Sequence, residues 1–364
     1  MKPEMPPIAE TDESYDRIND YFYARGWTDG LPIVPPTEGR VRAMLAGMPG
    51  HDADELVSVV PPKMGRATMR QIAINAVMAG CTPEYLPVVV AALQAVSEPA
   101  YGLSHRQTTT HAGAPLIIVN GPIAKRLRIN GGRGLFGPGW RANATIGRAL
   151  RLVIMNIGGA RPHGITKATM GHPGQYTFLV AEDEETSPWE PLHVERGFQP
   201  DDSVITLFPA IGFQQIVDFQ STTAEQLVAS LGWTMAGGVW SHKDYPLLCD
   251  AVLVLSPEHA RTIAKDGWSK RDVRQFLYET IKRPTAELAP GKDGGGGLSE
   301  ALLRSPRMQG VAGDGWVRKF RSPDSILIVV AGGTAGRLSV VIPGWASGEF
   351  DASAPVSHRI RLNG

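Results

Sequence analysis

The sequence predicts an α/β fold of two similar halves, each with mainly parallel strands covered by helices. Four short apolar runs are typical of buried parallel strands, and they lie at 116–119, 177–180, 252–255 and 326–330. Helical patterns separate them, and the order helix, strand, helix, strand occurs twice along the chain. This alternation predicts three segments: a disordered N-terminus at 1–12, a first α/β half at 13–200 and a second at 201–364.

Composition limits the classes of protein to which the chain can belong. Hydrophobic residues make up 43% of the 364 residues, which indicates a globular protein with a large core. Basic and acidic residues both number 36, so the zero net charge argues against nucleic acid as a partner. No apolar run approaches the ~20 residues of a membrane span, and no signal peptide is recognisable. With only two cysteines, these features predict a cytoplasmic protein without membrane contact, and large apolar α/β proteins of this kind often form homo-oligomers.

The first half contains clear helix and strand signals. A helix is expected after Ser14, followed by a proline-rich extended arm at 26–37 that ends with Thr37 as a helix cap. A strand at 57–60 precedes Thr68 and Gln71, whose spacing predicts a capping box at the start of the next helix.

Pro83 opens a further helix that runs to about Val96. The buried strand at 116–119 follows, then the glycine-rich loop with its helix, and then the strand at 177–180.

The second half repeats several of these signals. Thr223 and Gln226 open a helix as Thr68 and Gln71 do, and Ser269 caps an amphipathic helix. These matches predict an internal duplication, whose natural ligand site is the cleft between the halves. The segment 291–298 is rich in glycine and is expected to be a flexible connector or a lid.

Residues 130–148 combine a glycine-rich loop with the start of a helix. Asn143 is placed to cap that helix, and three arginines lie close by, so the loop is expected to bind a small anion. The glycine spacing matches neither the P-loop nor the dinucleotide fingerprint, so no nucleotide is implied. An ordinary surface loop is the alternative. The substrate-binding residues expected from this reasoning are Gly137, Gly139, Arg141, Asn143, Thr145 and Asn120.

An acidic run follows the strand at 177–180 and ends near a histidine. If two of its carboxylates converge, one pKa rises and the pair becomes suited to general acid–base catalysis. Oxygen and imidazole ligands also suit a divalent metal, with Glu182, Glu185 and His193 as ligands. The alternative is a solvated loop. The catalytic candidates in this run are Glu182, Glu184 and His193.

Cysteine and asparagine residues supply the remaining candidates. Cys81 lies just before the helix that Pro83 begins, and the positive end of that helix is expected to lower the thiol pKa and make Cys81 reactive. The alternative is a small buried residue, and Cys249 is expected to be structural. Asn75 and Asn120 lie in apolar elements, where a bridging role is expected. No H-E-x-x-H, C-x-x-C or G-x-S-x-G motif occurs.

Four strings of the sequence resemble the UGSC family, which is named for a selenocysteine (or cysteine)-Gly-Ser-Cys motif. They lie at 29–37 (DGLPIVPPT), 75–87 (NAVMAGCTPEYLP), 141–148 (RANATIGR) and 187–193 (SPWEPLH). The resemblance extends from about Gly26 to Trp345 and implies thiol or selenol redox chemistry. This chain contains no Cys-Gly-Ser-Cys, so a separate redox protein would have to supply that motif, or it is absent here.

These observations leave three functional hypotheses. The first is an enzyme that cleaves or reduces a carbon–heteroatom bond of a small anionic molecule, bound in the cleft between the halves. The second is a metal-dependent hydrolase or hydratase that uses the acidic run and His193. The third is a non-catalytic subunit that binds a separate redox protein.

Overall fold

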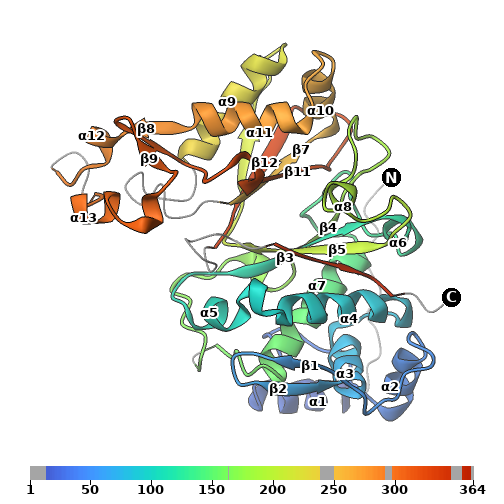
Figure 1. The fold of residues 1–364 in the computed structure, drawn as a ribbon. Helices are drawn as coiled ribbons and strands as arrows, with labels where there is room; N and C mark the ends of the chain where they lie inside the picture. The colour runs from blue at the N-terminus through green and yellow to red at the C-terminus, as the bar shows by residue number, and fades with distance from the viewer. Residues whose placement is uncertain (1–13, 163, 238–249, 292–296, 346–354, 362–364) are drawn as a thin grey trace.

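Two four-stranded sheets pack face to face, with a layer of helices on each outer side (Figure 1). The computed structural model describes residues 14–162, 164–237, 250–291, 297–345 and 355–361. The predicted disorder at 1–12, Cys249 and most of the predicted connector at 291–298 lie outside this description. The chain is therefore a mixed α/β protein.

The first sheet has the strand order β13-β5-β3-β4. Its parallel pair joins β3 and β4, while β5 runs antiparallel to both β3 and β13. The bounds are β3 (Ala114–Asn120), β4 (Leu179–Ala181), β5 (Val204–Ala210) and β13 (Val356–Arg359). Two of these strands come from beyond residue 200, so the expected boundary between the halves does not coincide with the boundary between the sheets.

The second sheet has the order β11-β7-β12-β6 and the same combination of directions. Here β7 and β11 are parallel, and β12 is antiparallel to both β7 and β6. The bounds are β6 (Gln214–Val217), β7 (Ala251–Leu255), β11 (Ile326–Val330) and β12 (Leu338–Pro343).

Both sheets are mixed, which corrects the expectation of mainly parallel strands. The four strands expected from apolar runs do form the two parallel pairs, β3 with β4 and β7 with β11. The antiparallel partners β5, β6, β12 and β13 were not expected from the sequence. Two of them, β6 and β13, expose polar residues and lie at sheet edges, so no continuous apolar run marks them.

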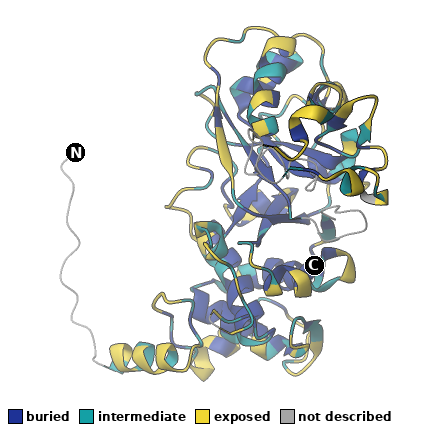
Figure 2. Ribbon diagram, turned by 90° about the vertical axis from the view of Figure 1, so that its left-hand side faces the viewer, coloured by how far each residue is buried: buried dark blue, intermediate teal, exposed yellow. Residues whose placement is uncertain are grey.

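Alternation along each central strand divides the apolar residues between two cores. In β3, Leu116 and Ile118 face the second sheet, whereas Ile117 and Val119 face the helices of the first half. In β7, Val252 and Val254 meet the first sheet, while the alternate leucines face the second helical layer. The space between the two sheets is therefore a packed core (Figure 2), where the sequence led us to expect a cleft.

Helices α4 and α7 pack on the first sheet, and α3 packs against these two helices. The predicted capping box is confirmed at α3, where Thr68 accepts from the Gln71 backbone and Gln71 bonds back to Thr68. The bounds in this layer are α1 (Ser14–Ala24), α2 (Glu38–Leu45), α3 (Met69–Ala79), α4 (Leu86–Ser97), α5 (Leu103–Thr108), α6 (Pro122–Arg126), α7 (Arg141–Asn156) and α8 (Leu192–Glu195).

Helices α9, α10 and α11 pack on the second sheet and form its outer core. Ser269 caps α11 in a capping box with Asp272, and Thr223 accepts from the Gln226 backbone at the start of α9, as expected. The bounds are α9 (Ala224–Gly237), α10 (Pro257–Ala264), α11 (Lys270–Thr280), α12 (Thr285–Leu288) and α13 (Glu300–Leu303).

Two small sheets complete the fold. The hairpin of β1 (Leu56–Val60) and β2 (Gly65–Thr68) lies next to α4, where Val57 and Val60 join the first helical core. The second small sheet has the order β8-β10-β9, with β8 (Lys282–Pro284), β9 (Ala312–Gly313) and β10 (Trp316–Arg318).

No single described helix is long and apolar enough to cross a membrane. One pair, Pro83–Ser97 with Pro99–Thr108, meets the length and composition only when taken together, and it bends by 70°.

Candidate functional site

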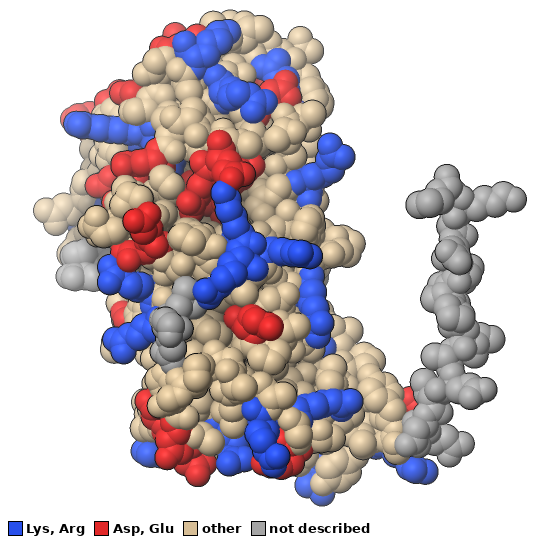
Figure 3. Space-filling view, turned by 90° about the vertical axis from the view of Figure 1, so that its right-hand side faces the viewer, with Lys and Arg blue, Asp and Glu red and all other residues tan. Residues whose placement is uncertain are grey.

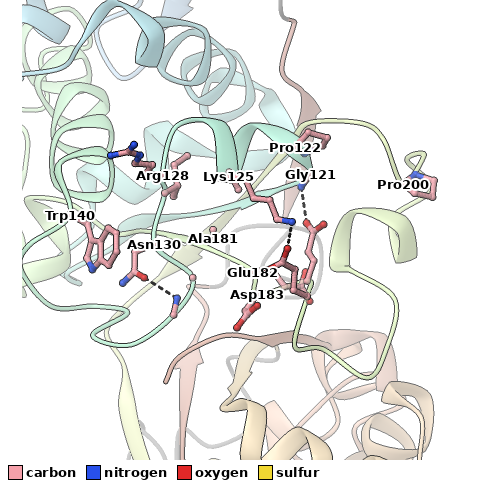
Figure 4. Close-up of a pocket in the computed structure, with 16 residues that line it drawn as sticks. Gly121, Pro122, Lys125, Arg128, Asn130, Trp140, Ala181, Glu182, Asp183 and Pro200 are labelled. Carbon is pink, nitrogen blue, oxygen red and sulfur yellow. Dashed lines mark hydrogen bonds and ion pairs between the residues drawn. The ribbon is translucent and has the colours of Figure 1, made fainter. Parts of the chain in front are cut away.

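A cavity of about 510 Å³ lies where β3 and β4 end, between the glycine-rich loop and the acidic run (Figure 4). In open α/β folds, ligands bind beyond the carboxyl ends of strands, because loops with polar groups gather there. The cavity is lined by Gly121, Pro122, Ala124, Lys125, Arg128, Ile129, Asn130, Gly131, Gly132, Trp140, Ala181, Glu182, Asp183, Glu184, Glu185 and Pro200. All of these residues belong to the first half.

One backbone hydrogen bond joins the acidic run to β3 within the first sheet, and two more tie this site to the second sheet. Glu182 N donates to Val119 O, Asp183 N donates to Val330 O, and Gly332 N donates to Gly131 O. The carboxyl ends of β3, β4 and β11 therefore meet at one edge. The second half supports the site from behind without lining the cavity.

Glu182 is the most deeply placed carboxylate at this edge. Its Oε2 accepts from Asn120 Nδ2 and from Leu192 N, both at 2.7 Å, and its Oε1 lies 3.5 Å from Lys270 Nζ. Burial raises the pKa of Glu182, while Lys270 and the two hydrogen bonds act in the opposite direction. The nearby carboxylate of Glu184 raises it further.

Asn120 links the two carboxylates. Its Nδ2 donates to Glu182 at 2.7 Å and to Glu184 Oε1 at 2.9 Å, so both acidic groups share one amide. Within the described part of the chain, its buried Oδ1 has no hydrogen-bond partner. The bridging role expected for this residue is what the geometry shows, and it places Asn120 at the base of the site.

Glu184 lies closer to solvent than Glu182. Its Oε1 accepts from Asn120 and from Gly121 N, the latter at 2.7 Å, and 27% of the side chain is exposed. Two donors to one oxygen fix the carboxylate against the end of β3. Glu184 is the candidate base that is both oriented and accessible.

His193 lies directly beside this carboxylate. The side chain is fully buried, its Nε2 lies 3.3 Å from Pro200 O, and its Nδ1 lies 3.8 Å from Glu184 Oε1. The carbonyl of Pro200 requires a proton on Nε2, because only an N–H can donate to it. In the neutral ring Nδ1 is then an acceptor, and it has no hydrogen-bond partner among the described residues. Nδ1 therefore lies near Glu184 without a direct hydrogen bond to it, because 3.8 Å exceeds hydrogen-bond distance.

Charged residues of α11 support the acidic run from the other half. Lys270 Nζ lies 3.0 Å from Glu195 Oε2 and donates to Glu190 O at 2.8 Å, in addition to its contact with Glu182. Arg274 completes the group through Glu195 at 3.0 Å. This buried network holds the acidic run in place and attaches it to the second half.

Asn143 does not cap helix α7, contrary to the prediction from the sequence. The N-cap of α7 is Trp140, which makes no side-chain cap hydrogen bond, and Asn143 lies inside the first turn. Asn143 instead bonds both backbone groups of Asn130 and donates to Leu179 O at 2.9 Å. An amide carries both a donor and an acceptor, so here it satisfies the buried loop backbone in place of the helix end.

None of the six residues expected to bind substrate lies in the cavity lining: Asn120 and Asn143 are absent from it, as are Gly137, Gly139, Arg141 and Thr145. Both Nε and Nη2 of Arg141 donate to Gly80 O, at 3.0 and 2.9 Å, so this side chain turns to α3. Thr145 Oγ1 donates to Arg141 O within its own helix.

The cavity instead contains basic and aromatic residues that the sequence reasoning missed. Lys125 forms an ion pair with Glu185 at the acidic end of the cavity, whereas Arg128 and Trp140 lie at the opposite end (Figure 4). Basic side chains gather on this face of the molecule directly beneath an acidic group (Figure 3). The missed signal was the basic run 125–128, which begins in the last turn of the short helix α6 after the buried strand β3.

Cys81 does not have the predicted reactive environment. Its side chain is buried, it donates to Thr145 O at 3.3 Å, and burial raises its pKa to about 12. The expected lowering by a helix N-terminus fails because desolvation of the thiolate outweighs the hydrogen bond and the nearby arginines. The structural alternative therefore describes this residue.

The donor set does not fit the metal site considered from the sequence. The described residues contain no group of three or more His, Cys, Asp or Glu side chains that is arranged to hold a metal ion. Glu185 turns to Lys125 at the surface, whereas the oxygens of Glu182 are engaged by Asn120, Leu192 and Lys270. We derive no step through a metal.

Comparison with known proteins adds no family: no protein-family model matches the chain, and no curated protein matches it. The resemblance to the UGSC family stays a prediction from the four strings, as does partnership with a separate redox protein.

Proposed function

We propose that the protein is an enzyme that cleaves a carbon–heteroatom bond of a small anionic molecule by acid–base chemistry. The observation that carries this proposal is the Asn120 amide, which holds Glu182 and Glu184 together at the edge of a cavity of about 510 Å³. Paired carboxylates in different environments are typical of sites that move protons, because their pKa values separate.

The cationic end of the cavity supports an anionic substrate. Arg128 is exposed at the lining and takes part in no ion pair within the described part of the chain. Its backbone is left-handed, with φ of 54°, which fixes an unusual direction for the side chain. A guanidinium matches the geometry of a carboxylate or phosphate, and Trp140 supplies an adjacent apolar surface.

The acidic end supplies the proton transfer. Glu184 takes a proton from the substrate carbon, the C–H electron pair forms a new double bond, and the heteroatom group leaves with the C–X pair. His193 Nδ1 lies 3.8 Å from Glu184 and stabilises its orientation and its charge when the ring is protonated. Glu182 and Asn120 act as positioning residues. Reduction of the same bond, the other expected reaction, needs an external electron donor, because Cys81 is buried.

Proton exchange provides a direct test of this proposal. The full-length protein is incubated in D₂O with small carboxylates that bear a hydroxyl, amino or thiol group at carbon 2 or 3. We expect deuterium incorporation or elimination by NMR with the wild type, and a loss of at least about 100-fold in Glu184→Gln, since general bases contribute about 10²–10⁴-fold. Glu225→Gln, at an exposed carboxylate on α9 that does not line the cavity, is the matched control and should react as the wild type.

Binding is tested separately from chemistry. Arg128→Gln should weaken binding of the reactive carboxylate, and Arg66→Gln, an exposed arginine on β2, should not. Equal exchange rates in wild type and Glu184→Gln would refute the proposed base, and equal affinity in Arg128→Gln would refute the proposed anion contact.

We also propose that the two halves arose by duplication. In each sheet the connection within the parallel pair begins with two helices, α6 and α7 after β3 and α10 and α11 after β7, and an antiparallel strand lies beside the first strand of the pair. The second connection is longer, because α12, α13 and the small sheet of β8, β9 and β10 precede β11. Superposition of these two units should align β5 with β12. The oligomeric state stays a prediction, to be measured by sedimentation.

A further inference from the structure

A second cavity, of about 470 Å³, lies beside the C-terminal part of α7. Its lining comes from the arm after α1, from α7 and from the segment before β4, and it shares no residue with the first cavity. The residues are Asp29, Arg151, Met155, Pro162, Met170, Gly171, His172, Pro173, Gln175 and Tyr176.

The one carboxylate among these lining residues is already neutralised. Arg148 Nε contacts Asp29 Oδ2 and Arg148 Nη2 contacts Asp29 Oδ1, both at 2.8 Å. The Asp29 side chain is 4% exposed and that of Arg148 is 14% exposed, so this bidentate pair is largely shielded from water. A carboxylate held in this way has little charge left for a second cation.

Arg151 is that second cation. It is 9% exposed, and its Nη1 donates to the neutral side chain of Gln107 at 3.2 Å. Arg151 forms no salt bridge within the described ranges, although buried charges in proteins are ordinarily paired. Burial lowers the pKa of Arg151, and the charge of Asp29, which is shared with Arg148, acts in the opposite direction.

The histidine in the lining, His172, does not compensate the charge of Arg151. Gly174 N donates to His172 Nδ1 at 3.1 Å, which requires a lone pair on that nitrogen and therefore a neutral ring. Burial also lowers the pKa of His172, which favours the neutral ring. With Asp29 paired to Arg148, the cavity holds one uncompensated positive charge.

We propose that this cavity is a binding site for a small monocarboxylate with an apolar carbon skeleton. The planar guanidinium of Arg151 matches a carboxylate, and a monoanion balances a single positive charge. Met155, Met170 and Tyr176 provide apolar surface for the carbon skeleton. The site is separate from the cavity of the proposed enzyme and stands independently of that function.

The test uses matched acids and amides. Acetate, benzoate and 3-phenylpropionate, each beside its neutral amide, are titrated into the full-length protein by calorimetry. We expect at least one acid to bind about tenfold or more tightly than its amide, with benzoate or 3-phenylpropionate above acetate. Arg151→Met should abolish this preference, and Arg151→Lys should retain part of it, because a lysine keeps the charge without the planar fork.

Variants at an exposed position of the lining test the site even where the Arg151 variants do not fold. Met170 lines the cavity and is 89% exposed, so substitution there leaves the core intact. Met170→Glu should weaken acid binding at least threefold relative to Met170→Gln, through repulsion. Arg66→Gln, at an exposed position of β2 that lines neither cavity, should leave it unchanged. If no acid binds better than its amide, or if Arg151→Met and Met170→Glu both bind as wild type, the site is not an anion site.

Discussion

At the scale of single residues, buried amides organise both the site and its support. Asn75 donates to Gln71 O at 2.9 Å and accepts from Asn156 Nδ2 at 2.8 Å, and Asn120 joins two carboxylates. The sequence indicated bridging at both positions, because a polar residue in an apolar element must find partners. Asn143 was placed wrongly, since its partners Asn130 and Leu179 become neighbours only in the folded chain.

Cys81 should be unreactive in the native protein. In a Cys249→Ser background, we expect Ellman's reagent to leave the native thiol unmodified at pH 8 and to titrate it fully in 6 M guanidinium chloride. The reason is that burial keeps the thiol protonated, with its pKa raised to about 12. Rapid labelling of the native protein would mean that the thiol is accessible and ionised.

Lys270→Met should destabilise the protein in a pH-dependent manner. The variant leaves Glu182 buried without its cation, so we expect a loss of about 3 kcal/mol at pH 8 by urea denaturation. A buried carboxyl with a raised pKa holds its proton when folded, so stability is present at low pH and falls as pH rises through the folded pKa. The loss should therefore be smaller at pH 5.

A surface ion pair provides the control for that variant. Lys125 and Glu185 have side chains that are 72% and 70% exposed, so Lys125→Met should leave the urea midpoint nearly unchanged at either pH. A Lys270→Met loss as small as this would show that the buried network does not stabilise the fold.

At the scale of elements, close packing of α7 against the segment before β4 depends on one glycine. A Cβ on Gly147 would meet Thr177 Oγ1 and would lie 3.1 Å from the backbone N of Phe178. The same close approach allows Thr177 Oγ1 to donate to Asn143 O at 2.6 Å. The glycine is therefore required by tertiary packing, although glycine is a poor helix former.

Helical glycines in α7 and α9 should respond oppositely to alanine. Gly147→Ala should destabilise the protein by about 2 kcal/mol or more, because backbone atoms must move. Gly232→Ala should be neutral or stabilise by up to about 1 kcal/mol, since its Cβ would have ordinary contacts beginning at 3.4 Å from Leu277. Chemical denaturation measures both, and equal effects would contradict the assigned packing.

At the scale of the whole molecule, the two sheets share one core. Residues from both, including Phe208 of β5 and Val254 of β7, form a single buried cluster between the sheets. The last strand, β13, also returns to the first sheet, so the chain crosses between the two sheets more than once. These links favour cooperative unfolding of the two halves.

Phe208→Ala tests that cooperation. Phe208 is fully buried, so its loss should cost about 3–5 kcal/mol. Trp27 in the first core and Trp268 in the second are reporters of the two helical layers. We expect their fluorescence, measured in single-tryptophan variants, to follow one transition that shifts equally in Phe208→Ala. Separate transitions would show that the halves unfold independently.

The sequence by itself determined the helix starts at Thr68 and Ser269, the four strands of the two parallel pairs and the acidic run after β4, because these depend on neighbours in the chain. Tertiary structure decided the rest. It added the antiparallel strands, turned Arg141 to Gly80, buried Cys81 and placed Lys125 and Arg128 in the cavity. Each of these depends on desolvation or on contacts between residues far apart in sequence, which local patterns do not encode.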